Sequence, residues 1–416
     1  MIPGELWTLR DLFVLPNEYV YWSIQIVMYP FMTGLVAGAF VLSSLYHVFG
    51  IKPLRDIARF ALVFSFALLP GALVPLLLHL QSPVRGINVL MTPHFTSAIA
   101  AFGIVFSTYF MIVASELWFI YRRHFVQESL LLRKPHRTLR ERVRSIVFTT
   151  LTLGAFDTSE KALRTDEKAT KILAALGIPI ALFLHGYAGF IFGSVKANAL
   201  WMTPLMPVIF IVSAVVSGIA FCMLTYILVM EFRKLRAGRK SRAARSREGR
   251  EEIAGAEVDV IRITAKYLVG FLILAMGLEL LDLVFRRYTA VKSWDVLASA
   301  VYGREFKQVF LLQYGIGSLV PLVLFLIPRL TVRRAAVGVA LVLFGIFMMR
   351  WNVVIGGQSF SLTLAGYMHY VLPIVPTSWE TFKEGAFGAI SVLLFPFLLF
   401  YLLVKICPVF APPEAG

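Results

Sequence analysis

Long apolar stretches alternate with short polar ones along the whole of this 416-residue chain. Each apolar stretch has roughly the 20 residues that an α-helix needs to cross the hydrocarbon core of a bilayer. We therefore predict an all-α, polytopic membrane protein with about nine transmembrane helices. The predicted spans cover residues 19–48, 57–80, 95–121, 169–194, 205–232, 258–286, 304–328, 333–352 and 381–406.

One further apolar stretch, residues 144–156, is too short for a full span. It is predicted either to lie on the membrane or to form half of a tenth helix. The composition agrees with a membrane protein, because 58% of the residues are hydrophobic and only 15% are charged. The net charge of +16 then indicates cytoplasmic loops and contact with anionic membrane lipids, and no nucleic-acid partner is expected.

Basic residues collect in alternate loops, and the most basic segment is 233–250. By the positive-inside rule these loops face the cytoplasm, which places the N-terminus outside the cytoplasmic (inner) membrane and the C-terminus inside. The loop after the sixth span fits less well, since it also carries arginines and a lysine. The basic run suggests three parts: residues 1–232 with the first bundle and the start of the second, a cytoplasmic linker 233–257, and the remainder 258–416.

Polar side chains inside the predicted spans gather toward the outer end. Intramembrane polar groups are costly, so they tend to face a bundle interior, a partner or a ligand. Taken singly, each also has a structural explanation, such as an ion pair between Glu116 and Arg122 or Arg123, or between Asp282 and Arg286. Arg350 could extend to the lipid head groups in the same way as other arginines near helix ends. Glu116, near the inner end, is the exception. The group at the outer end comprises His79, His185, Tyr187, Lys196, Glu279, Asp282, Arg350, Trp351 and Asn352, with Tyr19, Tyr21 and Gln25 at the start of the first span.

Of the chemistries that such residues could support, a quinone site fits best. The seven histidines are scattered and form no metal-ligand pattern, so no metal site is predicted. Neither CxxC nor CxxCH occurs, which predicts no iron–sulfur cluster and no c-type haem in this chain. Haem held by His79 and His185 stays open as a less favoured alternative. A quinone needs an apolar slot with His, Tyr or a carboxylate at its mouth.

Several segments resemble the polysulfide-reductase membrane-subunit family of the NrfD/PsrC type. The resemblance extends over roughly residues 20 to 405, and its motifs come in the expected order. It is strongest to the longer members from sulfite-reduction-linked (DsrP-like) and high-molecular-weight cytochrome (HmcC-like) complexes. The segments are Leu78-His-Leu-Gln-Ser-Pro-Val-Arg85, Pro93-His-Phe-Thr-Ser97, Gly186-Tyr-Ala-Gly189, Trp201-Met-Thr-Pro-Leu-Met-Pro207 and Arg350-Trp-Asn-Val-Val-Ile-Gly-Gly-Gln358.

The resemblance implies a fold and a role in electron transport. The fold would be two four-helix bundles, from spans 1–4 and 5–8, with an extra helix. The role would be exchange of electrons between menaquinone or another quinone and an extracytoplasmic, ferredoxin-like iron–sulfur subunit. Further subunits, cytochromes among them, would complete an anaerobic respiratory oxidoreductase complex linked to sulfur compounds, in which this chain is not catalytic alone.

The resemblance also implies roles for particular residues. Tyr187 would hydrogen-bond the quinone, helped by Asn17 and Tyr21, and Arg85 would hold a loop over the pocket. His79 and His185 are our candidates for proton exchange. Some family members have an acidic residue in the second helix for proton conduction, and the second span here has none. Another proton pathway would then use Glu116, Glu279, Asp282 and Arg350.

Two other functions remain open from the sequence. A secondary transporter could use Glu279, Asp282 and Arg350 as its ion or substrate site. A purely structural anchor predicts that His79, His185 and Tyr187 can be replaced without effect on quinol turnover.

Overall fold

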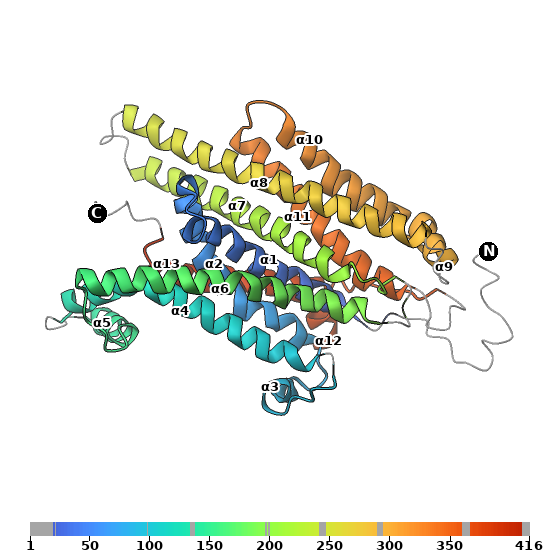
Figure 1. Cartoon of the computed structure of the whole chain (residues 1–416), viewed down its shortest axis with the longest axis horizontal. Helices are drawn as coiled ribbons and strands as arrows, with labels where there is room; N and C mark the ends of the chain where they lie inside the picture. Colours follow the sequence, from blue (N-terminus) through green and yellow to red (C-terminus); the bar gives the residue numbers. More distant parts are fainter. Residues whose placement is uncertain are drawn as a thin grey trace.

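A computed structural model describes residues 20, 22–97, 99–133, 138–195, 198, 200–240, 247–288, 294–359 and 367–409, without the side chains of residues 234–257 and Val296. Within these ranges nine helices are long and apolar enough to cross a membrane, which confirms the predicted all-α fold. Most run along the long axis of the molecule (Figure 1). The long helices are α1 (Ile24–His47), α2 (Arg55–His79), α4 (Ala100–Leu131), α6 (Glu160–Gly193), α7 (Met206–Lys240), α8 (Arg247–Tyr288), η6 (Lys307–Leu319) continued by α10 (Val320–Leu326), α11 (Val332–Val354) and α13 (Ala386–Ile406).

Short helices join the long ones at the two ends of the molecule. We name these ends after two of the short helices, which lie at opposite ends in Figure 1 and give the α9 end and the α5 end. The short helices are α3 (Asn88–Met91), α5 (Leu139–Leu151), α9 (Trp294–Ala298), η5 (Ser299–Arg304) and α12 (Trp379–Lys383).

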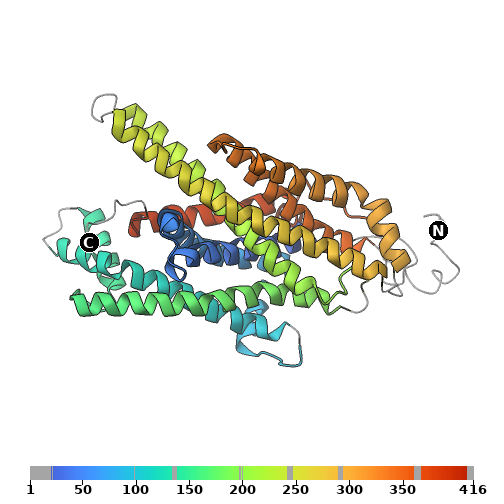
Figure 2. The same ribbon diagram turned by 45° about the horizontal axis from the view of Figure 1, so that its top comes forward.

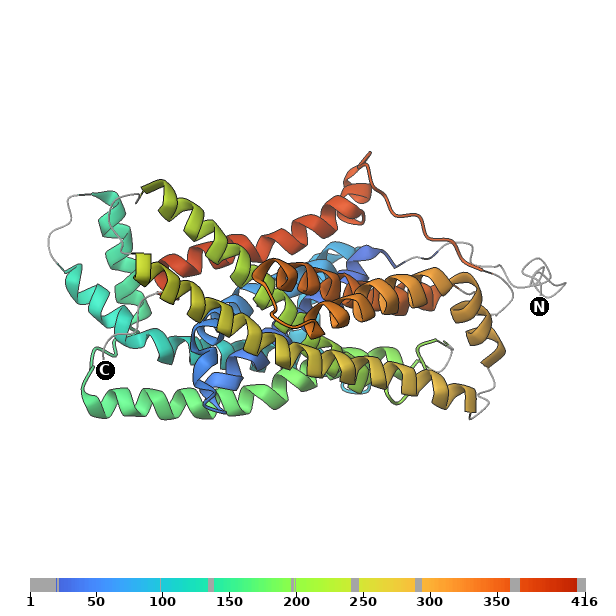
Figure 3. The same ribbon diagram turned by 90° about the horizontal axis from the view of Figure 1, so that it is seen from above.

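The helices form two bundles with one helix outside them. Helices α1, α2, α4 and α6 pack into the first bundle, and α7, α8, η6 with α10, and α11 pack into the second. The extra helix α13 packs on α2 and lies along one edge of the molecule (Figure 3). Helices α7 and α8 project beyond the rest of the body at the α5 end (Figure 2), so helical residues occupy much of the segment 233–257.

The two bundles meet along a close seam between α1 and α7. A Cβ atom built on Gly38 would lie 2.2 Å from the carbonyl oxygen of Ala214, and one on Gly218 would lie 2.3 Å from the Cα of Gly38. Only glycine permits this approach of two helix backbones, a common way to pack helices in membranes. The seam therefore fixes how side chains of the first bundle face those of the second.

Besides those of α7 and α8, two more helix boundaries differ from the sequence prediction at the α5 end. Helix α4 continues to Leu131 and α6 begins at Glu160, so both extend well past the apolar stretch that defined their spans. Ser159 caps α6 by accepting a hydrogen bond from the backbone amide of Ala162. The extensions carry charged residues that hydropathy cannot assign to a helix. Between them lies α5, which exposes Leu139, Val143 and Ile146 in an amphipathic stripe.

The seventh span is unusual because η5 and η6 are π-helical. Such segments are rare in proteins and often occur at functional sites. Gly317 of η6 packs directly against Gly345 of α11, where a Cβ on either glycine would collide with the other backbone. The irregular span is thus pressed onto α11 near the middle of its length.

Candidate functional site

Three polar side chains meet at the α9 end, where α1, α2 and the segment before α13 converge. Ser23 is the N-cap of α1, His79 ends α2, and Glu384 follows α12. His79 Nδ1 lies 3.1 Å from Glu384 Oε2 and 3.4 Å from Ser23 Oγ. The Ser23 hydroxyl also donates to Glu384 Oε2. We call these three residues the His79 cluster.

The hydrogen bonds of the His79 cluster determine the tautomer of His79. An ionised carboxylate can only accept, so Nδ1 carries the proton that goes to Glu384. Among the described residues Nε2 has no hydrogen-bond partner, and about a quarter of the His79 side chain is exposed (23%). The arrangement leaves Nε2 with a free lone pair, backed by a carboxylate that would stabilise the imidazolium formed on proton uptake.

The environment of Glu384 favours its charged form. Burial alone would raise the pKa of this carboxyl, but the hydrogen bonds from His79 and Ser23 outweigh burial and leave the pKa below its ordinary value of 4.5. Neighbouring contacts hold the segment in place. The backbone amide of Ile24 donates to the Tyr370 hydroxyl at 2.9 Å, and the Gln25 side chain donates to the carbonyl oxygen of Lys383.

His185 lies elsewhere, sealed at the seam between the bundles with no exposed surface. Arg350 of α11 donates to His185 Nε2 at 2.9 Å, and His185 Nδ1 lies 3.2 Å from Thr33 Oγ1 of α1. A guanidinium can only donate, so Nε2 must accept and Nδ1–H must donate to Thr33. Both ring nitrogens of His185 are therefore occupied, in contrast to His79.

Arg350 is fully buried without a carboxylate in contact among the described residues. Its guanidinium donates to Ser213 Oγ at 2.7 Å and lies 3.9 Å from the centre of the Phe210 ring. Within the described part of the chain its Nε has no hydrogen-bond partner. The carboxylate of Glu279 on α8 attracts the Arg350 guanidinium without touching it. The expected extension of Arg350 to the lipid head groups is therefore wrong, because the side chain points into the protein.

Tyr187 faces away from His185. Two residues along an α-helix turn a side chain by about 200°, so the two cannot serve one pocket from α6. The Tyr187 ring lies 5.9 Å from both Phe183 and Phe190, two half-exposed rings on the outer face of α6.

The structure does not bring the predicted residues into one cluster. His79 belongs to the His79 cluster, His185 to the seam, and Tyr187 to the outer face of α6. Arg85 is exposed on a turn of 3₁₀-helix, Pro83–Ile87, in the loop after α2. Asn17 and Tyr21 lie outside the described residues.

A pocket of about 130 Å³ lies instead within the second bundle, between α7, α8, η5, η6 and α11. At its inner part the Gln313 amide donates to Glu279 Oε2 at 2.7 Å, and Asn352 donates to Gln313 Oε1 at 2.7 Å. Glu305 lines the pocket nearer the α9 end, and burial raises the pKa of this carboxyl. Within the described residues no group of three or more His, Cys, Asp and Glu could hold a metal ion.

Asp282, the other predicted acidic residue of α8, is already paired. Its carboxylate lies 2.9 Å from Arg286 Nε and accepts a hydrogen bond from the Thr203 hydroxyl. Arg286 also donates to the carbonyl oxygen of Leu200. The predicted ion pair between Asp282 and Arg286 is confirmed, and the pair anchors the loop between α6 and α7 to α8.

Two segments that carried the family resemblance turn out to contact each other. The Trp201 indole donates to the carbonyl oxygen of Val353, and the Asn198 amide donates to that of Gly357 at 2.6 Å. Trp201 also stacks on Trp22 with 5.2 Å between ring centres. The loop between α6 and α7 therefore fastens the end of α11 to the start of α1.

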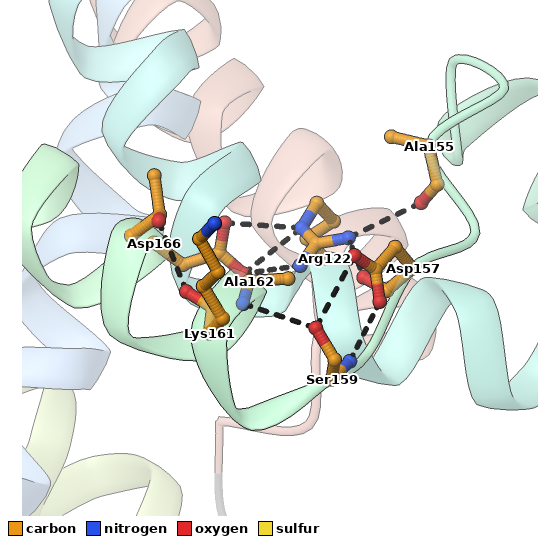
Figure 4. Close-up of polar contacts among 8 residues, drawn as sticks. Arg122, Ala155, Asp157, Ser159, Lys161, Ala162 and Asp166 are labelled. Atoms are coloured by element: carbon orange, nitrogen blue, oxygen red, sulfur yellow. Dashed lines mark hydrogen bonds and ion pairs between the residues drawn. The ribbon is translucent and has the colours of Figure 1, made fainter.

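Near the α5 end, Glu116 and Arg122 of α4 have separate environments. Arg122 does not pair with Glu116; its three guanidinium nitrogens contact the Asp166 carboxylate and the carbonyl oxygens of Ala155 and Asp157 at 2.6–3.2 Å (Figure 4). Both carboxyl oxygens of Glu116 are buried and have no hydrogen-bond partner among the described residues. The predicted pairing of Glu116 with Arg122 is thus wrong, and Asp166 is the true partner.

Sequence reasoning missed several of these partners. Glu384 precedes the last span, and alternation of the loops already places it on the same side as the end of α2, so that signal was available. Thr33, Ser213 and Gln313 gave none, because single hydroxyl and amide residues inside spans are common.

The fold and these polar groups define a polytopic helical membrane protein with polar centres at one end and at the seam of two bundles. Comparison with known proteins identifies the family. The model of the family "Polysulphide reductase, NrfD" matches residues 15–362, and the chain belongs to this family.

Curated relatives support the assignment. A selenate reductase subunit of Mesobacillus selenatarsenatis is 32% identical over 215 residues, which cover 50% of this chain and 49% of the relative. A protein assigned as a dimethyl sulfoxide reductase membrane subunit, from Halobacterium salinarum, is 25% identical, over 77% of this chain and 65% of the relative. The Hdr-like menaquinol oxidoreductase integral membrane subunit of Archaeoglobus fulgidus is 23% identical, over 52% and 45%. The chain thus spans about half the length of two of these relatives and just under two thirds of the other.

Proposed function

We propose that this chain is the quinone-reactive membrane subunit of a respiratory oxidoreductase complex. Membership of the NrfD family and the name of the menaquinol oxidoreductase relative support the class. The structural observation that carries the proposal is the His79 cluster, a partly exposed histidine with a carboxylate on Nδ1 and, among the described residues, no partner on Nε2. It lies where α1 begins and α2 ends, so in a membrane it would be near a boundary, at the depth of a quinone head group.

The residues of the His79 cluster fit the chemistry of a quinone. Bound quinol supplies two electrons and two protons on oxidation, and a quinone takes up the same number on reduction. His79 Nε2 would accept a proton or a hydrogen bond from a quinol hydroxyl, while Glu384 holds the imidazolium that results. The electrons would pass to an extracytoplasmic iron–sulfur subunit. Tyr187 stays a second candidate contact, reached from the outer face of α6.

The arginines of the α5 end agree with a cytoplasmic location for that end, which would put the His79 cluster outside. The relatives are named for different compounds, namely selenate, dimethyl sulfoxide and menaquinol. We therefore assign the choice of terminal substrate to the partner subunits. A sulfur compound is one such substrate. No described residue favours the transporter alternative over this proposal, since Asp282 and Arg350 are already engaged within the protein.

The proposal is tested by quinol turnover in the intact complex, purified with its partner subunits. Removing a general base typically costs 10²–10⁴ in rate, so His79→Gln should lower turnover by about 100-fold or more. His94→Gln is the matched control, because His94 is an exposed histidine in the loop that follows His79. Tyr187→Phe should lower turnover by a smaller factor.

Equal turnover in the His79 and His94 variants would overturn the role of the His79 cluster and favour a structural anchor. Purification of the chain as a lone protein, without iron–sulfur partners, would overturn the wider proposal.

A further inference from the structure

The pocket of the second bundle has a chemistry that the quinone proposal does not use. It runs from Leu200, Arg286 and Leu297 near the α9 end inward to Glu279 and Gln313. Along α8, the seven residues from Arg286 to Glu279 correspond to about 10 Å. The volume of about 130 Å³ is well above the roughly 10–15 Å³ that one water molecule needs, so several waters fit. A pocket with purely hydrocarbon walls would stay dry, but polar side chains line this pocket from Arg286 to Glu279.

The spare hydrogen-bonding capacity of the pocket consists of acceptors. The amides of Gln313 and Asn352 already donate, to Glu279 and to Gln313 respectively. Arg286 donates to Asp282 and to a backbone carbonyl. The Glu279 carboxylate accepts hydrogen bonds from the neutral side chains of Gln313 and Tyr314 only, with no cation in contact among the described residues. One oxygen of Glu305 lies 3.7 Å from Arg304 Nε. Asn352 Oδ1 is buried and has no partner within the described residues. Such a set of acceptors recognises a cationic or proton-donating guest.

We propose that this pocket is a hydrated proton-binding site, with Glu279 as the group that takes up the proton. The proton enters past Glu305 and reaches the Glu279 carboxylate, whose hydrogen-bond donors Gln313 and Tyr314 are both neutral. Asp282 does not take part, because Arg286 and Thr203 occupy its carboxylate. The site is separate from the His79 cluster and does not depend on the quinone proposal.

The groups that face Glu279 give the site a connection to the first bundle. From η6 come Gln313 and Tyr314, from α11 come Asn352 and the charge of Arg350, and from α8 comes Asp282. Helix α7 contributes only the apolar Met206 and Ile209 to the pocket. Arg350 in turn holds His185 at the seam. A proton on Glu279 therefore removes the charge that acts on Arg350 and weakens the attraction of the guanidinium toward α8.

The test is labelling with dicyclohexylcarbodiimide, a reagent that modifies protonated carboxyl groups in apolar surroundings. The full-length protein is labelled in native membranes from about pH 5 to about pH 9, and modified peptides are identified by mass spectrometry. We expect an adduct on Glu279 that declines as pH rises, no adduct on Asp282 one turn away, and loss of the adduct in Glu279→Gln.

Three results would overturn the proposal: no adduct on Glu279 at any pH, an adduct that does not change with pH, or equal labelling of Asp282. Asn352→Leu provides a second arm, since it removes a polar group of the pocket and keeps Glu279. It should lower the initial rate of Glu279 labelling at least twofold, and an unchanged rate would contradict a hydrated path. The readout requires no quinol turnover, so a failure of the quinone proposal leaves it intact.

Discussion

The two ends of the molecule hold ion pairs of opposite character. At the α5 end, Arg122 directs all three nitrogens at oxygens of Asp166 and of two backbone carbonyls, and almost nothing is exposed. At the α9 end, His79 uses one nitrogen for Glu384, and its other nitrogen, at a partly exposed position, has no partner in the described part of the chain. A buried charge with every partner in place stabilises the fold, whereas spare hydrogen-bonding capacity beside a surface or pocket indicates chemistry.

The seam between the bundles lies between these two cases. Arg350 is as buried as Arg122, yet its partners are His185, Ser213 and an aromatic ring in place of a carboxylate. Both nitrogens of His185 are occupied. This comparison is the reason why we propose proton exchange for His79 and a positioning role for His185 and Arg350.

The largest expected effect follows from breaking the ion pair between Arg122 and Asp166. Asp166→Asn leaves the Arg122 guanidinium buried without a countercharge, which should lower the free energy of unfolding by about 3–5 kcal/mol. Thermal unfolding in detergent measures this loss. Glu160→Gln is the control, because it removes an exposed ion pair with Arg164 and should cost less than about 1 kcal/mol. A similar loss in both variants would show that the α5-end pair does not stabilise the fold as described.

A smaller effect should follow from Arg350→Lys. Lysine keeps the charge but cannot reach His185 and Ser213 together, so the free energy of unfolding should fall by about 1.5–3 kcal/mol. The exposed Arg164→Lys serves as the control. Quinol turnover per folded complex should fall less than in His79→Gln. A turnover loss as large as that of His79→Gln, without loss of thermal stability, would place Arg350 in the reaction itself.

The smallest effect concerns the pH dependence of the His79 cluster. The pKa of Glu384 is lower in the folded protein than its ordinary value of 4.5. A carboxyl of this kind adds stability above its unfolded pKa and loses it as pH falls through the folded pKa. The wild-type protein should therefore be more stable than Glu384→Gln by up to about 1 kcal/mol near neutral pH. This difference should shrink below about pH 4.5.

Thermal unfolding of both proteins across this range checks the prediction. Glu380→Gln, at an exposed neighbour of Glu384, is the control. A difference that stays constant into the acid range, or grows there, would contradict a depressed pKa for Glu384.

Hydropathy was sufficient for the fold, because a span is a local property of about 20 consecutive residues. All nine spans were predicted, although the charged extensions of α4 and α6 were not. The candidate site was harder, since its partners come from segments far apart in sequence. His79 and Glu384 are 305 residues apart, and the sequence around either residue does not identify the other as its partner. The sequence prediction grouped His185 with Tyr187 because they lie at a similar depth in the membrane. In the structure they point to different sides of α6.

Photoaffinity labelling with an azido-quinone in the intact complex tests the central claim most directly. The label is mapped by mass spectrometry, with excess unmodified quinone as competitor. We predict competed labelling at the α9 end, on peptides that contain Ser23, His79 or residues 367–385. Competed labelling confined to the α5 end, on residues 139–166, would contradict a quinone-reactive site at the His79 cluster.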